Sequence, residues 1–400
     1  MSVWLLKIDF QNLSHFQDGK IAIDFITEKR VLSEELDDGT VSRLFGRVYK
    51  LNAIAFAGIN AAGKTTLLSL LSGLLKTYIG NGSLSYDMRF KAFFDSELEV
   101  ESFFYEEETG LVYKLISVIK KDAEAQTLTF KSERLYKRTV TASTNSKNLF
   151  DFAEDEPYLD RSTIESAFLK KEDSIFSVVM NKYNRAASSI QDLCSITNHN
   201  WISKVAFDLV VPFAQYLDSS IEYIKLKDTP AHQPSRLAFE IKFKQQQQAI
   251  VAEPGDLELY LSSGTIKGIN CLSAISIVFA QGGYVLIDEI ENHLNKTIVI
   301  SLIDLFTSDL NRRKATLLFS THYSEILDCI SRSDGIYLLN KTDSIQVKKF
   351  SIAAGTNDRK DKRKSDLVMS GTLNGAPSYS AYRRLVESLA SFLWEEDSDD

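Results

Sequence analysis

Hydrophobic and polar residues alternate along the first part of the chain with the period of β-strands. The runs WLLKIDFQNL and KIAIDFI, both before residue 57, follow this pattern and predict antiparallel strands. The alternation returns between Ser96 and Val140, where the turn-forming sequences Glu-Thr-Gly and Asp-Ala-Glu separate the runs. We therefore expect a meander of strands in this part of the chain.

The periodicity changes in the middle of the chain. From Ser162 to about Asp218, apolar residues recur at steps of three and four, which predicts helices; no sustained heptad repeat indicates a long coiled-coil arm. Two strand-like runs, SIEYIKLK and LAFEIKFK, come next. From Leu257 to about Lys349, strand and helix patterns alternate as in a parallel sheet.

These patterns predict an α/β fold with a parallel sheet, an antiparallel β lobe and an inserted helical lobe. The expected parts are an N-terminal half, a mainly helical insertion, a C-terminal half that returns to the parallel sheet, and a C-terminal segment. Their ranges are 1–141, 142–235, 236–350 and 351–400.

The sequence AGINAAGKTT joins a strand-like run to a leucine-rich helical pattern. Its spacing, Gly-x-x-x-x-Gly-Lys-Thr, is that of a phosphate-binding loop, in which glycines allow backbone N–H groups to turn toward phosphate oxygens. The helix that follows adds the positive end of its dipole. We expect Lys64 to reach the β- and γ-phosphates of a nucleoside triphosphate and the Thr65 hydroxyl to bind Mg²⁺. The residues predicted to contact the nucleotide here are Gly58, Asn60, Ala61, Ala62, Gly63, Lys64, Thr65 and Thr66.

Two further apolar runs end in side chains that suit phosphate chemistry. The run Tyr284–Ile287 predicts a buried strand that delivers Asp288 and Glu289 to the carboxyl edge of the sheet, where ligands bind. Asp288 suits the shell of a Mg²⁺ ion, and Glu289 suits a general base that polarises water. The second run, 315–319, leads to His322, whose imidazole can donate to a γ-phosphate.

The sequence LSSGT begins another predicted helix with serines and a glycine. Its N–H groups and a serine hydroxyl would again face an anion. Because one nucleotide rarely needs two such helix starts, we expect a dimer in which Ser262 and Gly264 of one chain cover the γ-phosphate held by the other. A serine-rich helix cap without a ligand remains the alternative.

Composition and charge narrow the class of protein. The net charge of −8 argues against coating nucleic acid through the overall field, although the basic run 359–364 leaves a local contact with nucleic acid or an acidic partner open. The three cysteines are far apart and show no metal spacing, which fits a reducing cytosol; they are Cys194, Cys271 and Cys329.

One stretch has the length of a membrane span. No charged residue occurs between Gly268 and Ile287. Polar residues and the pair Gly282-Gly283 within it favour a buried helix followed by a buried strand. We therefore expect no membrane association and a cytoplasmic location.

The order GINAAGKT, LSSGT, VLIDEIEN and FSTH resembles the ABC-type ATPase heads of the RecF, SMC and overcoming-lysogenization-defect group. There the four motifs stand for Walker A, the signature, Walker B and the histidine switch. The resemblance implies an ABC-ATPase head with a RecA-like parallel sheet, ATP and Mg²⁺ as cofactors, and a homodimer closed around ATP. The same motifs look like those of stand-alone AAA ATPases encoded beside toxins or nucleases in prokaryotic antiviral operons, including AbiL, PARIS and Septu systems.

The resemblance also assigns roles to residues of this chain. It gives catalysis to Lys64, Glu289 and His322, metal binding to Thr65 and Asp288, and the contact across the dimer to Ser262 and Gly264. The signature departs from LSGGQ, with Ser263 and Thr265 in place of its first glycine and its glutamine. No glutamine loop can be placed, because Gln126 lies in a strand-like run where a structural role is expected.

The sequence leaves two functions open. In the first, the ATPase senses a trigger and controls a separate effector, a nuclease or toxin, in antiphage defence. The alternative is a RecF- or SMC-like ATPase that acts directly on DNA, with salt-sensitive binding in a basic groove. A transporter subunit fits the long meander and insertion badly, and an inactive scaffold is disfavoured because Lys64, Asp288 and Glu289 are all present.

Overall fold

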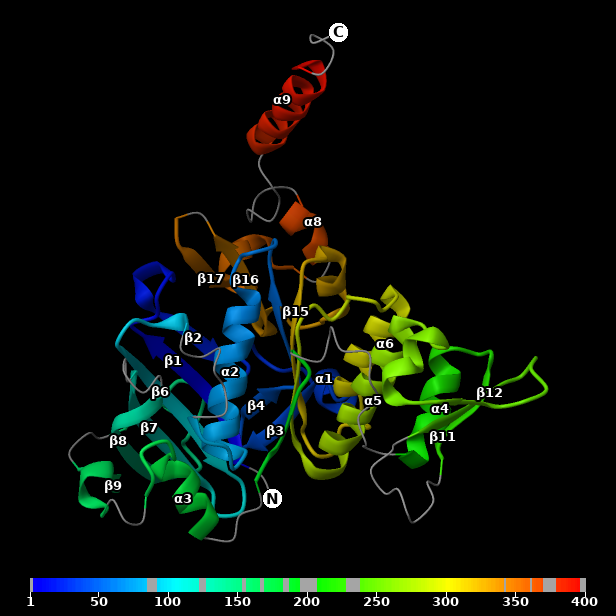
Figure 1. Ribbon diagram of the computed structural model, residues 1–400. Helices are drawn as coiled ribbons and strands as arrows, with labels where there is room; N and C mark the ends of the chain where they lie inside the picture. Colours follow the sequence, from blue (N-terminus) through cyan, green and yellow to red (C-terminus); the bar gives the residue numbers. More distant parts are fainter. Residues whose placement is uncertain are drawn as a thin grey trace.

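The computed structural model places two six-stranded sheets on either side of one long helix (Figure 1). It describes residues 3–84, 92–121, 127–152, 156–165, 169–182, 187–194, 207–227, 238–341, 343–359, 362–369 and 379–395. The α/β class expected from the sequence is confirmed.

The first sheet is the predicted parallel sheet, and it unites the two halves of the sequence. Its strand order is β10-β14-β15-β5-β16-β17, in which β17 alone runs antiparallel to its neighbour. β5 lies between β15 and β16, so a strand near the N-terminus is paired with strands more than 250 residues away. The strands are β5 (Ala53–Ala57), β10 (Ser189–Asp192), β14 (Gly283–Ile287), β15 (Thr316–Thr321), β16 (Ile336–Lys341) and β17 (Ile345–Lys349).

Alternate residues of this sheet enter two different cores. Ile54 and Phe56 of β5 face α2 (Lys64–Ile79), whereas Ala55 and Ala57 face α5 (Ser263–Gln281) and α6 (Lys296–Phe306). Because a strand points successive side chains to opposite faces, a strand covered on both faces is apolar throughout. That is why β5 and β14 read as continuous apolar runs, as do residues 317–319 of β15.

The second sheet is antiparallel and covers the other side of α2. Its order is β2-β1-β6-β7-β8-β9, and the expected meander corresponds to β6, β7 and β8. A small hairpin and a short helix lie beside it. These elements are β1 (Val3–Gln11), β2 (Ile21–Asp24), β6 (Glu97–Glu106), β7 (Leu111–Lys121), β8 (Leu128–Thr139), β9 (Leu159–Asp160), the hairpin β3 (Val41–Phe45) and β4 (Val48–Leu51), and α1 (Ser33–Asp37).

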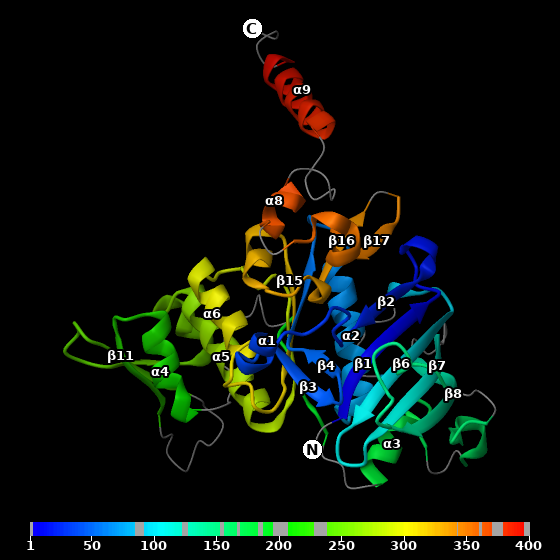
Figure 2. The same cartoon turned by 180° about the vertical axis from the view of Figure 1, so that it is seen from behind.

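A third lobe packs on the first turns of α5. It consists of α4 (Phe207–Leu217) and the antiparallel strands β11 (Ile221–Leu226), β12 (Phe239–Phe243) and β13 (Ile250–Ala252). Ile266 and Ile269 of α5 belong to its core. In Figures 1 and 2 this lobe lies on the side of α5 and α6 away from the antiparallel sheet.

The region 142–235 differs from the helical expectation. Its described residues form α3 (Ile175–Lys182) and α4, and also the strands β9, β10 and β11. The positions 153–155, 166–168, 183–186, 195–206 and 228–235 are outside the described residues. The sequence pattern did not reveal β10. All four of its side chains are half-buried, so its residues do not alternate between buried and exposed as those of a typical strand do. It is a strand because its backbone pairs with β14, and its Asp192 accepts a hydrogen bond from Ser72 of α2 at 2.6 Å.

The described residues of the C-terminal segment form three α-helices. They are α7 (Phe350–Ala354), α8 (Lys364–Met369) and α9 (Tyr379–Glu395), and α9 projects away from the rest of the protein (Figures 1 and 2). The acidic end, 396–400, and positions 360 and 361 of the basic run are outside the described residues. Short 3₁₀ helices complete the chain: η1 (Gln17–Gly19), η4 (Arg161–Thr163), η5 (Pro254–Leu259), η6 (Ser324–Cys329), η7 (Ser333–Gly335) and η8 (Gly355–Asn357).

The apolar stretch 268–287 is a buried helix and strand, as predicted. α5 is the one helix in the described ranges that is long and apolar enough to cross a membrane, and 67% of its apolar window is buried inside the protein. Packing on both the parallel sheet and the third lobe explains its composition.

Candidate nucleotide-binding site

The loop between β5 and α2 has the geometry that its glycines predicted. Gly63 adopts φ +94°, a conformation that favours glycine, and α2 begins directly after it with no side chain capping the helix. A Cβ atom at Gly58 would lie 2.2 Å from the carbonyl oxygen of Leu339, so the loop packs directly on β16. The first N–H groups of α2 therefore meet no capping side chain, as an anion site requires.

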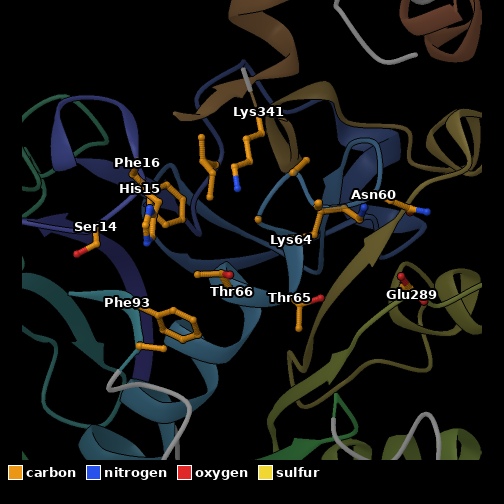
Figure 3. Close-up of a pocket in the computed structure, with 15 residues that line it drawn as sticks. Ser14, His15, Phe16, Asn60, Lys64, Thr65, Thr66, Phe93, Glu289 and Lys341 are labelled. Carbon is orange, nitrogen blue, oxygen red and sulfur yellow. The ribbon is translucent and has the colours of Figure 1, made fainter. Parts of the chain in front are cut away.

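A cavity of about 340 Å³ opens over this loop (Figure 3). One wall consists of the loop and the start of α2, residues 60–66, with Glu289 beside it. The opposite wall comes from distant segments and carries two aromatic rings, a histidine and a lysine. Its side chains include His15, Phe16, Phe93 and Lys341. A polar end and an aromatic end give the cavity the character of a nucleotide site.

The side chain of Lys64 folds back onto the loop. Its Nζ donates to the carbonyl oxygens of Gly58 at 2.8 Å and Ile59 at 2.9 Å. Burial lowers the pKa of Lys64 below its ordinary value, and the nearby carboxylates of 288, 289 and 291 oppose that shift. An anion in the cavity would therefore replace neutral carbonyls as the partner of a partly desolvated cation, a favourable exchange.

Thr65 and Asp288 meet at the start of α2. The Thr65 hydroxyl donates to Oδ2 of Asp288 at 2.6 Å, and the Ser320 hydroxyl donates to Oδ1. Hydroxyl and carboxylate oxygens are the ligands that Mg²⁺ prefers. No group of three or more His, Cys, Asp or Glu side chains in the described ranges could hold a metal unaided. The residues present therefore fit a Mg²⁺ ion that also takes phosphate and water oxygens as ligands.

Glu289 is held in an unusual backbone conformation. Its φ is +45°, its N–H donates to the Ser320 hydroxyl at 2.7 Å, and its side chain lines the cavity. A non-glycine residue persists in this region only when its surroundings enforce it, and such residues cluster at functional sites. The strain supports a functional role for this carboxylate.

His322 is oriented by a buried glutamate. Its backbone N–H donates to Oε1 of Glu291 at 2.7 Å, and its ring Nδ1 lies 2.6 Å from the same oxygen. The contact leaves Nε2 as the ring nitrogen that can meet a ligand. His322 does not line the cavity of its own chain.

The signature residues also lie outside the cavity lining. Ser262 caps α5, since its Oγ accepts from the N–H of Thr265 at 3.0 Å. Gly264 approaches the turn after β14 so closely that a Cβ atom would lie 2.4 Å from the carbonyl oxygen of His293. The predicted helix start is thus present, and it is not part of its own chain's nucleotide cavity.

The structure adds residues that sequence reasoning missed. They are Ser320 and Glu291, which position the acidic residues and His322, and the aromatic wall of the cavity. Ser320 and Glu291 stand inside the quoted motifs, so their proximity to Asp288 and His322 in sequence was a usable signal. No motif marks the aromatic wall. Gln126 is outside the described residues.

A phosphate loop after a central parallel strand, with Asp288 of the neighbouring strand end against Thr65, defines a P-loop nucleotide-binding protein. The comparison with protein families agrees. Residues 54–328 match the model described as "AAA domain, putative AbiEii toxin, Type IV TA system". The match spans more than half of the chain, and the chain belongs to this family.

Several solved structures of SMC heads are similar at low identity, whereas no curated protein matches this sequence. The SmcHead bound to the C-winged helix domain of ScpA has 13% identity over 86% of this chain and 97% of that chain, with a TM-score of 0.48. The Smc head domain from Pyrococcus furiosus, bound to the C-terminal domain of ScpA, has 11% identity over 90% and 100%, with a TM-score of 0.49. The SMC head domain from Thermotoga maritima has 11% identity over 86% and 98%, with a TM-score of 0.40. At these identities and TM-scores the likenesses carry no conclusion about function.

Proposed function

We propose that this protein is an ABC-type ATPase that binds and hydrolyses ATP, dimerises around it, and controls a partner effector, a nuclease or toxin, in antiphage defence. The observation that carries the ATPase proposal is the meeting of three groups at one loop. They are the Thr65 hydroxyl, the Asp288 carboxylate 2.6 Å from it, and the strained Glu289 at the cavity wall.

The chain's own groups divide the chemistry among them. Lys64 would exchange its loop carbonyls for the β- and γ-phosphates, and Thr65 and Asp288 would hold the Mg²⁺ ion. When bound, this ion neutralises charge on the phosphate oxygens. Glu289 accepts the proton of the attacking water, the role of a general base. His322, with Nδ1 on Glu291, presents Nε2 to the γ-phosphate.

A second copy of the chain completes the proposed site. Three predicted site residues do not line the cavity of their own chain: Ser262, Gly264 and His322. This fits a role at the partner's nucleotide, or a contact with ATP that forms only when the dimer closes. Large apolar side chains are exposed beside these residues in sequence: Leu259 is 74% exposed, and Tyr260 and Tyr323 are also exposed. Exposed apolar groups at functional positions favour a face that another protein surface covers.

A connection with toxin–antitoxin systems is supported by the family, whose description reads "putative AbiEii toxin, Type IV TA system". These words describe the family's own members, so the effector as a separate protein is part of the proposal. In this proposal the output is a change of conformation driven by ATP and read by another protein.

The first experiment compares the wild type with Glu289→Gln, and uses Glu99→Gln, an exposed change on β6, as the matched control. We expect the wild type and the control to release phosphate from ATP. Glu289→Gln should bind ATP, release little phosphate and accumulate at twice the molar mass of one chain. Full turnover in the Glu289→Gln variant would remove this residue from catalysis. Turnover that depends on added DNA would favour the DNA-acting alternative.

A further inference from the structure

A buried lysine joins the start of α5 to the turn that carries Glu289. Lys267 lies little more than one helical turn after Ser262, and only 7% of it is exposed. Its Nζ donates to the carbonyl oxygens of Glu289 at 3.0 Å and Asn292 at 2.6 Å. The bonds to both carbonyls are charge-assisted, which makes them stronger than bonds between neutral groups.

Two further contacts connect the same two segments. The Ser263 hydroxyl lies 3.2 Å from Nδ1 of His293, and Gly264 packs against the carbonyl oxygen of His293 with no room for a Cβ atom. Within this turn both Glu289 and His293 have positive φ, at +45° and +63°. These contacts tie the start of α5 to a turn whose strained backbone needs external support.

Burying the ammonium group of Lys267 costs free energy unless the group forms hydrogen bonds. Burial lowers the pKa of Lys267, while Cys271 and the carboxylates of residues 291, 289 and 288 raise it. A methionine would fill the same space without removing a charge from water. The two hydrogen bonds to the turn are what the ammonium group contributes here.

We propose that Lys267 is a positioning residue that couples the two nucleotide sites of the dimer. The proposal rests on the ATP-closed dimer proposed above. In that dimer, Ser262 and Gly264 contact the partner's nucleotide, whereas Glu289 acts on the nucleotide of its own chain. Because Lys267 links the two, closure of α5 on one ATP sets the position of Glu289 at the other ATP. Coupling of this kind appears as cooperativity in ATP turnover.

The test measures phosphate release against ATP concentration for the wild type, for Lys267→Met, and for Lys120→Met, an exposed change on β7. The wild type and Lys120→Met should give a Hill coefficient of about 1.5 or more, below the limit of two set by two sites. Lys267→Met should give a Hill coefficient of about 1 and a turnover number roughly tenfold lower, because Glu289 is no longer held in place. In the Glu289→Gln background, ATP-dependent dimerisation should persist in Lys267→Met.

Each outcome decides one question. Cooperative turnover in Lys267→Met equal to that of the wild type would overturn the coupling proposal and leave the ATPase proposal intact. A wild type that neither dimerises with ATP nor hydrolyses it would instead refute the proposed function. Should Lys267→Met fail to fold, Ser263→Ala removes the more exposed contact, that of the Ser263 hydroxyl with His293. This variant should lower the Hill coefficient part of the way. Unchanged cooperativity in Ser263→Ala would then count against the coupling.

Discussion

Ser320 is the residue on which the arrangement of the acidic groups depends most directly. Its buried hydroxyl donates to Asp288 and accepts from the N–H of Glu289 at 2.7 Å, so one side chain orients both. Ser320→Ala removes both hydrogen bonds without adding bulk. We expect it to lower both the stability of the fold and the rate of ATP hydrolysis.

The size of the stability change follows from these two contacts. Losing a hydrogen bond to a charged group costs about 1.5–3 kcal/mol, and leaving a buried N–H unpaired costs about 1–3 kcal/mol. Together they give roughly 3 kcal/mol or more. An unfolding entropy of about 2.1 cal/mol/K per residue for 400 residues gives about 0.8 kcal/mol/K. The melting temperature should therefore fall by about 4 °C if the chain unfolds as one unit.

The assay combines thermal unfolding with steady-state phosphate release. Ser388→Ala, an exposed change on α9, is the matched control and should change neither quantity. Turnover of Ser320→Ala should fall about tenfold or more, because small displacements of a general base are costly. A variant with both wild-type stability and wild-type turnover would refute the reasoning about Ser320.

Three further predictions test other parts of the account. Gly63→Ala should weaken ATP binding strongly, since an alanine is strained at φ +94° and its Cβ would meet Cδ1 of Ile345 at 2.7 Å, whereas Gly255→Ala in open space should bind normally; equal affinities in a titration would contradict this. Phe93→Ala should raise the Kd for ATP about tenfold through lost stacking, and Phe45→Ala should not; an unchanged Kd would remove the aromatic wall from the nucleotide site. Burial raises the pKa of Glu133 from 4.5 to about 7, so the folded protein favours the protonated carboxyl group. The free energy of unfolding should therefore fall by roughly 3 kcal/mol as the pH rises from about 4.5 to 7, and chemical denaturation of Glu133→Gln should not show this fall. Equal pH dependence of the unfolding free energy in the two proteins would show the reasoning to be wrong.

The sequence predicted those parts of the site in which neighbours in sequence are neighbours in space. The phosphate loop and the Asp288-Glu289 pair each occupy one short segment, and a strand followed by a turn delivers them to the sheet edge. Parallel pairing of β5 with β15 then brings distant strand ends together, because carboxyl ends of parallel strands share one edge. These general rules sufficed for the polar half of the cavity.

The aromatic half could not be predicted in the same way. His15 and Phe16 reach the cavity through a bridge to Ile345, whose N–H donates to the carbonyl oxygen of His15 at 2.7 Å. Phe93 comes from a third segment. Such a wall depends on tertiary packing between segments that no local pattern relates. The same holds for Lys267, which reads in sequence as one polar residue of an apolar helix.

The central claim is that each nucleotide is held by the loop of one chain and the α5 start of another. Mixing two inactive variants tests it most directly. Lys64→Ala damages the loop, and Ser262→Asp keeps the helix cap while placing a negative charge at the proposed γ-phosphate contact. Each variant alone should be inactive. An equal mixture should regain turnover, up to about one quarter of the wild-type value, because half of the dimers contain both variants and each of these has one intact site out of two; coupling between the sites lowers this value. A mixture as inactive as its components, or a Ser262→Asp variant that turns over ATP normally, would contradict the shared site.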